Sequence, residues 1–244
     1  MIEIKRLSKS FGKKTVVEDV TLKIHSKAIT SFIGPNGAGK STLLSMVSRL
    51  LDADTGEVLL DQSNVKKMKS DAFAKRVAIL KQANHFNIRL TVRELVAFGR
   101  YPYSKGRLNA EDHKFVDQAL DYMNLTDMQD MFLDELSGGQ KQRAFISMVI
   151  AQDTEYILLD EPLNNLDMKH SVQIMKILRQ LVDELGKTVV IVLHDINFAS
   201  VYSDRIVALI NGRLVKDGRT EEIINSESLR EVYDMHIPVQ VQDG

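Results

Sequence analysis

The sequence predicts an α/β fold with a mixed sheet at its core, an antiparallel β-subdomain at the N-terminal end and an α-helical subdomain inserted part-way along the chain. Three observations support this prediction. Apolar and polar residues alternate near the N-terminus, as they do in half-buried antiparallel strands. Short continuous apolar runs alternate with helical segments later in the chain, which is typical of buried parallel strands. Between two groups of these runs lies a stretch with helical signals instead of strand patterns.

Length, composition and charge exclude several classes of protein. A chain of 244 residues is long for one compact domain and short for two, so we expect one core with an insertion. Its 44 % hydrophobic and 27 % charged residues are close to globular averages, which argues against a disordered or fibrous chain. The net charge of -1 disfavours nucleic acid as a partner, although a local basic patch stays possible. Without cysteine the chain has no disulfide and no thiol redox centre.

The sequence predicts neither a membrane span nor an export signal. The longest strongly apolar runs, Thr188–Leu193 and Ile206–Ile210, are far shorter than the roughly 20 residues of a spanning helix. The N-terminal Ile2–Lys5 alternates like a strand and does not form a basic segment followed by an apolar core. We therefore expect a cytoplasmic chain.

The first third of the chain predicts two antiparallel strands and then a strand, loop and helix. Ile2–Leu7 and Val16–Ile24 alternate as half-buried strands do. The apolar Ile29–Ile33 leads into the glycine-rich Gly34–Gly39 and an apolar helical stretch, Ser41–Leu51. Such a unit implies a buried parallel sheet.

The middle of the chain, from about Gln82 to Asp134, predicts the helical insertion. Thr91 and Glu94 form the capping box of one helix, and Asn109 can cap a second. The predicted division is a core of residues 1–83 and 155–220, an insertion of approximately 84–154, and a C-terminal helix and tail of 221–244.

After the insertion the α/β alternation resumes. We predict strands at Tyr156–Leu159, Thr188–Leu193 and Arg205–Ile210, and a helix at Met168–Leu185 that Gly186 ends. Asn211-Gly212 predicts a tight hairpin turn into Arg213–Lys216.

A glycine-rich loop between the third strand and the first helix fits the phosphate-binding pattern. Its glycines let backbone N–H groups surround a β-phosphate, the helix N-terminus adds positive potential, Lys40 reaches the β- and γ-phosphates as a catalytic residue, and Ser41 ligates magnesium. The pattern therefore predicts the core of a P-loop nucleoside triphosphatase. The alternative is a glycine turn that caps an ordinary helix. The candidate phosphate-binding residues are Gly34, Pro35, Asn36, Gly37, Ala38, Gly39, Lys40, Ser41 and Thr42.

Two further segments carry candidate chemistry. The apolar strand at Tyr156 ends in Asp160, which can hold the magnesium shell, and Glu161, which can polarise a water as general base. A solvated acidic strand end is the alternative. Before the apolar helix Lys141–Ala151, Ser137 can act as the cap, and the exposed N–H groups of two glycines there form a second anion site. A plain capped helix start fits that segment as well. This second anion site comprises Ser137, Gly138, Gly139 and Gln140.

The sequence resembles the ATPase subunits of ABC transporters from end to end, and Leu136–Gln140 matches their signature motif without a mismatch. The resemblance implies that two chains pair head to tail, with the phosphate loop of one and the signature of the other closing on one ATP. It also implies that Phe11 stacks on adenine, where tyrosine is commoner, and that Gln82 contacts magnesium and the attacking water. The alternative for Phe11 is an ordinary buried residue, and the role of Gln82 rests on the resemblance alone.

The resemblance also assigns two residues near the γ-phosphate. Asp167, in the loop Asn164–Asp167, lies in the segment that crosses the dimer interface. His194 follows a strand at the position that distinguishes ATP from ADP, where the alternative is a structural histidine.

Within this family the sequence is similar to importer ATPases for iron-siderophore complexes, haem and cobalamin, on the segments Thr91–Pro102, Glu161–Met168 and His194–Ala199. The similarity implies an ATP- and Mg²⁺-dependent hydrolase on the cytoplasmic face of the membrane. Its expected partners are a second ATPase chain, a transmembrane permease and, through the permease, an extracytoplasmic binding protein. A ferric siderophore is the first choice of cargo. The alternatives are an exporter ATPase and a soluble ABC protein that acts on ribosomes or DNA. Phe86–Leu90 and Tyr101–Lys105 are expected to line the permease groove, unless they pack in the core.

Overall fold

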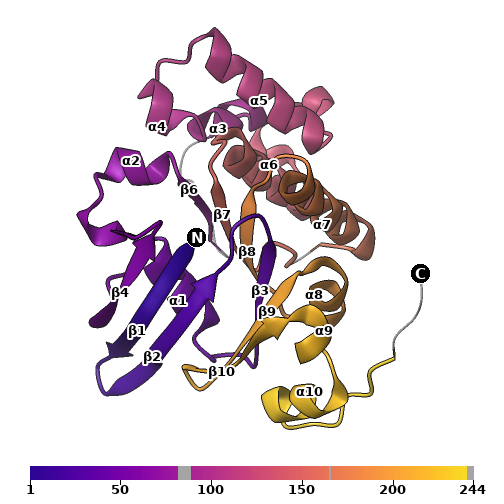
Figure 1. The fold of residues 1–244 in the computed structure, drawn as a ribbon. Helices are drawn as coiled ribbons and strands as arrows, with labels where there is room; N and C mark the ends of the chain where they lie inside the picture. The colour runs from indigo at the N-terminus through magenta and orange to yellow at the C-terminus, as the bar shows by residue number, and fades with distance from the viewer. Residues whose placement is uncertain (82–88, 165, 241–244) are drawn as a thin grey trace. The chain divides into compact units, whose positions relative to one another are not determined.

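The computed structural model describes residues 1–81, 89–164 and 166–240. The chain forms two compact units (Figure 1): Met1–Met68 with Thr188–Gly244, and Lys69–Lys187. The predicted helical insertion, 84–154, falls within the second unit.

The first unit begins with a four-stranded antiparallel sheet in the order β2-β1-β4-β5. Its strands are β1 (Ile2–Phe11), β2 (Lys14–Ile24), β4 (Thr55–Leu60) and β5 (Ser63–Asn64). Ile2 pairs with Ile24 on one side and with Leu60 on the other. The alternation that predicted β1 and β2 buries Ile2 and Ile4 while Lys5 stays exposed, so this prediction is confirmed.

The same unit contains parallel strands that are buried along most of their length. They are β3 (Ile29–Ile33), β8 (Thr188–Val192) and β9 (Arg205–Ile210), and β3 pairs in parallel with the other two. β10 (Arg213–Arg219) pairs antiparallel with β9. The helices of this unit are α1 (Lys40–Val47), α8 (Ile196–Tyr202), α9 (Thr220–Ile223) and α10 (Ser226–Tyr233), with a short 3₁₀ turn at Val65–Lys67. Since β3 and β8 are completely buried, the predicted parallel sheet is confirmed.

The hairpin turn between β9 and β10 has the backbone conformation that its sequence predicts. Asn211 and Gly212 both have positive φ, 47° and 80°, as the two-residue hairpin turn with Asn-Gly requires. The N–H of Gly212 donates to the carbonyl of Ala38 at 3.1 Å, and Glu18 donates to the carbonyl of Gly212 at 2.8 Å. The turn therefore bridges β2 and the glycine-rich loop.

The second unit contains two buried parallel strands and six helices among its described residues. The strands are β6 (Val77–Leu80) and β7 (Tyr156–Asp160), with Val77 opposite Tyr156. The helices are α2 (Ser70–Ala74), α3 (Val92–Phe98), α4 (Tyr101–Ser104), α5 (Ala110–Tyr122), α6 (Gly138–Ala151) and α7 (Met168–Asp183). Two 3₁₀ turns, Thr126–Met128 and Leu133–Glu135, lie between α5 and α6.

The helices α3, α5 and α6 pack against one another and form the predicted helical subdomain. Both predicted caps are present: Thr91 accepts from the N–H of Glu94 at 3.2 Å, and Asn109 accepts from the N–H of Asp112 at 2.9 Å. Gly99, directly after α3, lies so close to α6 that a Cβ there would be 2.1 Å from the carbonyl oxygen of Met148. A larger residue at 99 would separate the two helices.

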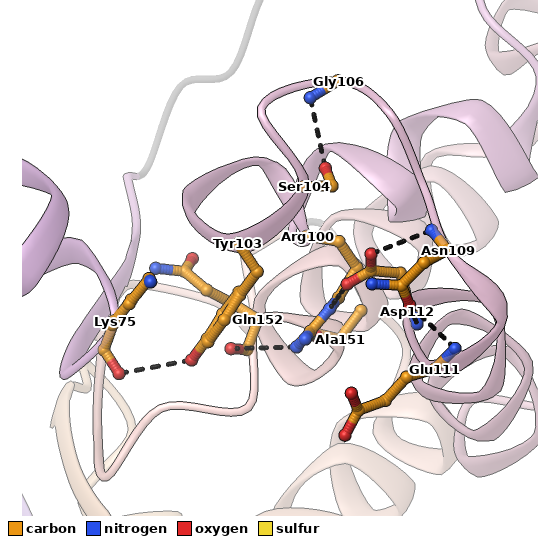
Figure 2. A network of polar contacts seen from close by, with 10 residues as sticks. All are labelled: Lys75, Arg100, Tyr103, Ser104, Gly106, Asn109, Glu111, Asp112, Ala151 and Gln152. Carbon is orange, nitrogen blue, oxygen red and sulfur yellow. Dashed lines mark hydrogen bonds and ion pairs between the residues drawn. The ribbon is translucent and has the colours of Figure 1, made fainter.

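A buried ion pair joins the starts of α4 and α5 to the end of α6 (Figure 2). The side chains of Arg100 and Asp112 are 4 % and 2 % exposed, and their Nε and Oδ1 atoms are 3.0 Å apart. Arg100 also donates to the carbonyl of Ala151 at 2.9 Å. Its guanidinium lies 4.0 Å and 4.2 Å from the ring centroids of Tyr103 and Phe115. Burial raises the pKa of Asp112, but hydrogen bonds from Asn109 and Arg100 outweigh this effect, so its pKa is below the usual value.

Two helices end earlier than predicted. The apolar pattern predicted a helix from Ser41 to Leu51, but α1 ends at Val47 because Arg49 has a left-handed backbone with φ of 62°. The helix predicted to reach Leu185 ends at Asp183, and Gly186, with φ of 62°, closes its last turn by donating to the carbonyl of Val182 at 3.1 Å.

Candidate nucleotide site

The glycine-rich loop of the first unit begins and ends at positions that only glycine can occupy. β3 ends at Ile33, and Gly34 follows it with φ of 135°. A Cβ at Gly34 would be 2.1 Å from the carbonyl oxygen of Leu209 on β9. Gly39 has φ of 94°, and a Cβ there would be 2.5 Å from the carbonyl oxygen of Val16. Glycine is therefore required by space as well as by conformation at both ends of the loop.

The loop leads directly into the N-terminus of α1. The carbonyl of Gly39 accepts from the N–H of Leu43 at 2.8 Å, which closes the first turn of the helix. Helix N-termini present backbone N–H groups that have no partner within the helix, together with positive potential. Asn36 and Gly37 at the tip of the loop are exposed. An anion that approaches the tip therefore meets the N-terminus of α1, as in phosphate-binding loops.

Lys40, the first residue of α1, extends over the loop. It is only 5 % exposed, and its Nζ donates to the carbonyls of Gly34 at 2.8 Å and Pro35 at 3.0 Å. Ser41 and Thr42 follow in the same turn and are half-buried. The predicted phosphate-binding residues form the loop and the first turn of α1 in the first unit. They are Gly34, Pro35, Asn36, Gly37, Ala38, Gly39, Lys40, Ser41 and Thr42.

One contact of the loop was missed by the sequence analysis. The N–H of Gly34 donates to the hydroxyl of Tyr233, the last residue of α10, at 3.2 Å. The two residues are 199 positions apart, and no sequence motif connects them.

Two other predicted residues of the first unit are accessible. Phe11, the last residue of β1, is 52 % exposed, so it is not the core residue of the alternative interpretation. His194 follows β8, is exposed, and lines a groove of about 900 Å³. Directly after it, Asp195 caps α8 by accepting from the N–H of Asn197 at 2.8 Å.

In the second unit, the two acidic residues at the end of β7 lie in different environments. Asp160 is 6 % exposed, whereas Glu161 is half-buried and has a left-handed backbone with φ of 50°. This conformation costs about 1 kcal/mol for a residue other than glycine. Asn164 donates to Oε2 of Glu161 at 2.6 Å. An unusual backbone and a close amide therefore fix the carboxylate of Glu161, as is common at functional sites.

The candidate second anion site is a capped helix start. Ser137 accepts from the N–H of Gln140 at 3.3 Å, and Gln140 accepts from the N–H of Ser137 at 2.8 Å. This capping box confirms that Ser137 caps the helix, which fits either interpretation, and the anion site stays a prediction. Gly138 is exposed, with no atom within 4 Å of where its Cβ would lie. The backbone at the start of α6 is therefore open to a ligand from outside the chain.

Hydrogen bonds fix Asp167, which follows the acidic pair, and connect α6 to the loop after β7. Asp167 caps α7 by accepting from the N–H of His170 at 2.9 Å, and the His170 ring nitrogen Nδ1 lies 2.8 Å from the same oxygen. These hydrogen bonds lower the pKa of Asp167. Gln142 on α6 donates to the carbonyl of Pro162 at 2.9 Å, which links the capped helix to the loop after β7.

The predicted site residues are thus divided between the two units. The first holds the phosphate loop, Phe11 and His194, and the second holds Asp160, Glu161, Asp167 and the capped start of α6. Gln82 lies outside the described residues.

The residues present suit Mg²⁺, which the resemblance of the sequence implies. Mg²⁺ prefers oxygen ligands and usually takes one or two protein groups together with phosphates and waters. The hydroxyl of Ser41 and the carboxylate of Asp160 are such groups. Among residues 1–81, 89–164 and 166–240 no cluster of three or more His, Asp or Glu side chains could hold a metal by itself, and a phosphate-bound Mg²⁺ needs none.

Comparisons with known proteins agree with these features. Residues 17–164 match the ABC transporter family. The chain belongs to the ABC transporter family. It is 62 % identical over 244 residues to the petrobactin import ATP-binding protein YclP of Bacillus subtilis (strain 168), covering 100 % of this chain and 97 % of the relative. It is 48 % identical over 239 residues to the petrobactin import ATP-binding protein FatE of Bacillus anthracis, covering 98 % of this chain and 96 % of that one.

A solved structure extends the likeness to the fold. The ATP-binding cassette MJ0796, in a dimeric post-hydrolysis state bound to ADP and Pi, superposes with a TM-score of 0.81 at 31 % identity, covering 90 % of this chain and 99 % of that one. As an ATP-binding member of the ABC transporter family, the chain is an ATP hydrolase that binds ATP. In the part of the chain that the structure describes, no helix combines the length and apolarity that crossing a membrane requires.

Proposed function

We propose that this ABC ATPase is the energy-supplying subunit of an importer that takes up a ferric siderophore through a membrane permease. The observation that carries the proposal is the 62 % identity, along the full chain, to a petrobactin import ATP-binding protein. A second petrobactin import protein is 48 % identical over 98 % of the chain. Ferric petrobactin is therefore the first cargo to test.

The phosphate loop binds the nucleotide in this proposal. The segment Gly34–Thr42 holds the phosphates through the backbone N–H groups of the loop after Pro35, and the positive end of α1 faces them. Lys40 exchanges the carbonyls of Gly34 and Pro35 for the β- and γ-phosphates, which are stronger acceptors because they are charged. The exposed ring of Phe11 stacks on the adenine.

Hydrolysis uses the residues at the ends of β7 and β8. Glu161, fixed by Asn164, polarises the attacking water as general base. Asp160 and Ser41, together with Gln82, would hold Mg²⁺, and the ion would supply positive charge to neutralise the transferred phosphoryl group. His194, exposed at the end of β8, donates to the γ-phosphate and so distinguishes ATP from ADP.

Two copies of the chain form the complete site, head to tail. The open, capped start of α6 at Ser137–Gln140 in one copy faces the γ-phosphate held by the other, and Asp167 lies at the interface between the copies. A helix N-terminus that begins with an exposed glycine, Gly138, is suited to bind an anion that another chain holds. The dimeric state of the similar cassette MJ0796 supports this arrangement.

The permease docks on the helical subdomain. Phe98 at the end of α3 and Tyr101 at the start of α4 are 46 % and 55 % exposed, so both aromatic side chains are accessible to a partner. They lie within or next to the predicted groove segment Tyr101–Lys105, while residues 86–88 of the other predicted segment lie outside the described residues. The subunit then works on the cytoplasmic face of the membrane, and a binding protein on the other side delivers cargo to the permease.

Isolation of the complex from membranes, followed by uptake measurements, tests this function. The tagged chain is expected to co-purify with a permease, and proteoliposomes of this complex are expected to take up ⁵⁵Fe-petrobactin when ATP and the cognate binding protein are present. Haem and cobalamin serve as competing cargoes. ATP-dependent release of cargo, or a complex with ribosomes instead of a permease, would replace the importer with one of the alternatives.

A further inference from the structure

We infer that Tyr233 is a positioning residue for the phosphate loop, which its hydroxyl anchors through the backbone N–H of Gly34. The inference rests on the proposed role of this loop in nucleotide binding. Tyr233 lies outside every motif of the sequence analysis, and its contact with the loop is visible only in the fold.

The C-terminal helix is docked so that its last residue reaches the loop. α10 packs on β9, and its Leu229 and Val232 are buried. An ion pair of 2.6 Å between Glu231 and Lys216 ties the helix to β10. The helix stops at Tyr233 because Asp234 has a left-handed backbone with φ of 53°. Tyr233 is thereby held at the end of a short, fixed helix.

Gly34 lies where the hydrogen bonds of β3 to its neighbours end. The last residue of β3, Ile33, is opposite Ala208 of β9. The next N–H, that of Gly34, donates to the Tyr233 hydroxyl at 3.2 Å. Gly34 is buried, so without this hydroxyl its N–H would lose a partner that water cannot easily replace.

The same peptide segment also holds the side chain of Lys40. The N–H of Gly34 is bound by Tyr233, and its carbonyl accepts from Nζ of Lys40 at 2.8 Å. The carbonyl of Leu209 limits movement of Gly34 on a further side. Tyr233 and Lys40 therefore both bind the backbone of Gly34, and the ammonium group of Lys40 is the group proposed to bind the β- and γ-phosphates. Burial raises the pKa of Tyr233, so its hydroxyl stays protonated and neutral at physiological pH.

The test is Tyr233→Phe, which keeps the ring and removes only the hydroxyl. We expect the Kd for ADP with Mg²⁺, measured by isothermal titration calorimetry, to rise about fivefold, which corresponds to about 1 kcal/mol. In steady-state hydrolysis the KM for ATP should rise by a similar factor, with kcat changed less than twofold. The melting temperature of the protein without nucleotide should stay nearly unchanged, because the ring still fills its place.

Two further variants separate positioning from packing. Tyr233→Leu removes ring and hydroxyl, so it should show the same rise in Kd together with a lower melting temperature. Tyr202→Phe removes a hydroxyl from a tyrosine of the same unit that stacks on Phe198, and it should leave Kd unchanged. An unchanged Kd in Tyr233→Phe, with or without a lower melting temperature, would overturn the inference.

Lys40→Ala distinguishes this inference from the role of the loop itself. If Lys40→Ala abolishes binding while Tyr233→Phe does not weaken it, only the inference about Tyr233 fails. If Lys40→Ala leaves binding intact, the loop is not the phosphate site and both ideas fail.

Discussion

Single backbone positions decide whether the phosphate loop can form. Gly34 and Gly39 lie so close to the carbonyls of Leu209 and Val16 that any Cβ would collide with them. The loop that results places Lys40 against two carbonyl oxygens, and the first turn of α1 follows directly. The position of the Lys40 ammonium group, and so its proposed role, therefore depends on Gly34 and Gly39, which carry no charge.

Lys40→Ala tests the assignment at this scale. Removing the ammonium group is expected to weaken ATP binding about 100-fold, since two charge-assisted hydrogen bonds contribute about 3 kcal/mol. Isothermal titration at low ionic strength measures the change. The matched control is Lys176→Ala, which removes an exposed lysine of α7 and should leave the affinity as it is. Normal ATP affinity of Lys40→Ala would discredit the assignment of the loop.

At the scale of elements, capping and buried charge organise the helical subdomain. The capping boxes at Thr91 and Asn109 begin α3 and α5. The pair of Arg100 and Asp112 then connects three helices through one buried guanidinium. Removing one partner of a buried pair leaves the other charge without compensation, which is more costly than losing a surface pair.

Asp112→Ala is therefore expected to lower the free energy of unfolding by about 3 kcal/mol at pH 7. The pKa of Asp112 is lower in the folded protein, so its stabilisation is complete above the unfolded pKa of about 3.9 and is lost as the pH falls through the folded pKa. The difference between wild type and variant should shrink accordingly below about pH 4. Urea unfolding from pH 7 to pH 3 measures it.

The control for this experiment lies on the same helix. Asp117 is 59 % exposed and pairs with Arg93 at 2.7 Å, so Asp117→Ala should cost less than about 1 kcal/mol. Equal losses for the two variants would contradict the role given to the buried pair.

Elements with a local signal were predictable from the sequence, and contacts between distant residues were not. Alternation predicted β1 and β2, and contiguous motifs predicted the phosphate loop and the capped start of α6. The early end of α1 was not predicted, because Leu50 continues the apolar pattern while Arg49 adopts a left-handed backbone. Tyr233 was missed because a hydrogen bond between residues 199 positions apart produces no periodic pattern in the sequence.

At the scale of the whole molecule, the proposed working ATPase is a dimer of two copies of the chain. Each chain carries the candidate phosphate loop. At the start of α6 it also carries Gly138, which is exposed and has no described atom within 4 Å of where its Cβ would lie. In the proposal each copy completes the site of the other, so hydrolysis depends on association while nucleotide binding does not.

Ser137→Arg tests this division of labour. A bulky cation at the start of α6 is expected to lower steady-state ATP hydrolysis about 100-fold, since it displaces groups that stabilise the transferred phosphoryl. Nucleotide affinity should stay normal, because the loop of the same chain is intact. Ser137→Ala is the control: it removes the cap, which costs about 1 kcal/mol of stability, without blocking the approach of the partner. Unchanged hydrolysis in Ser137→Arg would show that this segment does not act on the nucleotide of a second copy.

The most direct measurement is size-exclusion chromatography of Glu161→Gln with ATP and Mg²⁺. This variant keeps the shape of Glu161 but removes the carboxylate that polarises water, so ATP should remain bound without being cleaved. The account predicts that Glu161→Gln elutes as a stable dimer with two trapped ATP molecules and returns to monomer when ATP is replaced by ADP. Elution as a monomer with ATP bound would contradict the claim that two copies enclose the nucleotide.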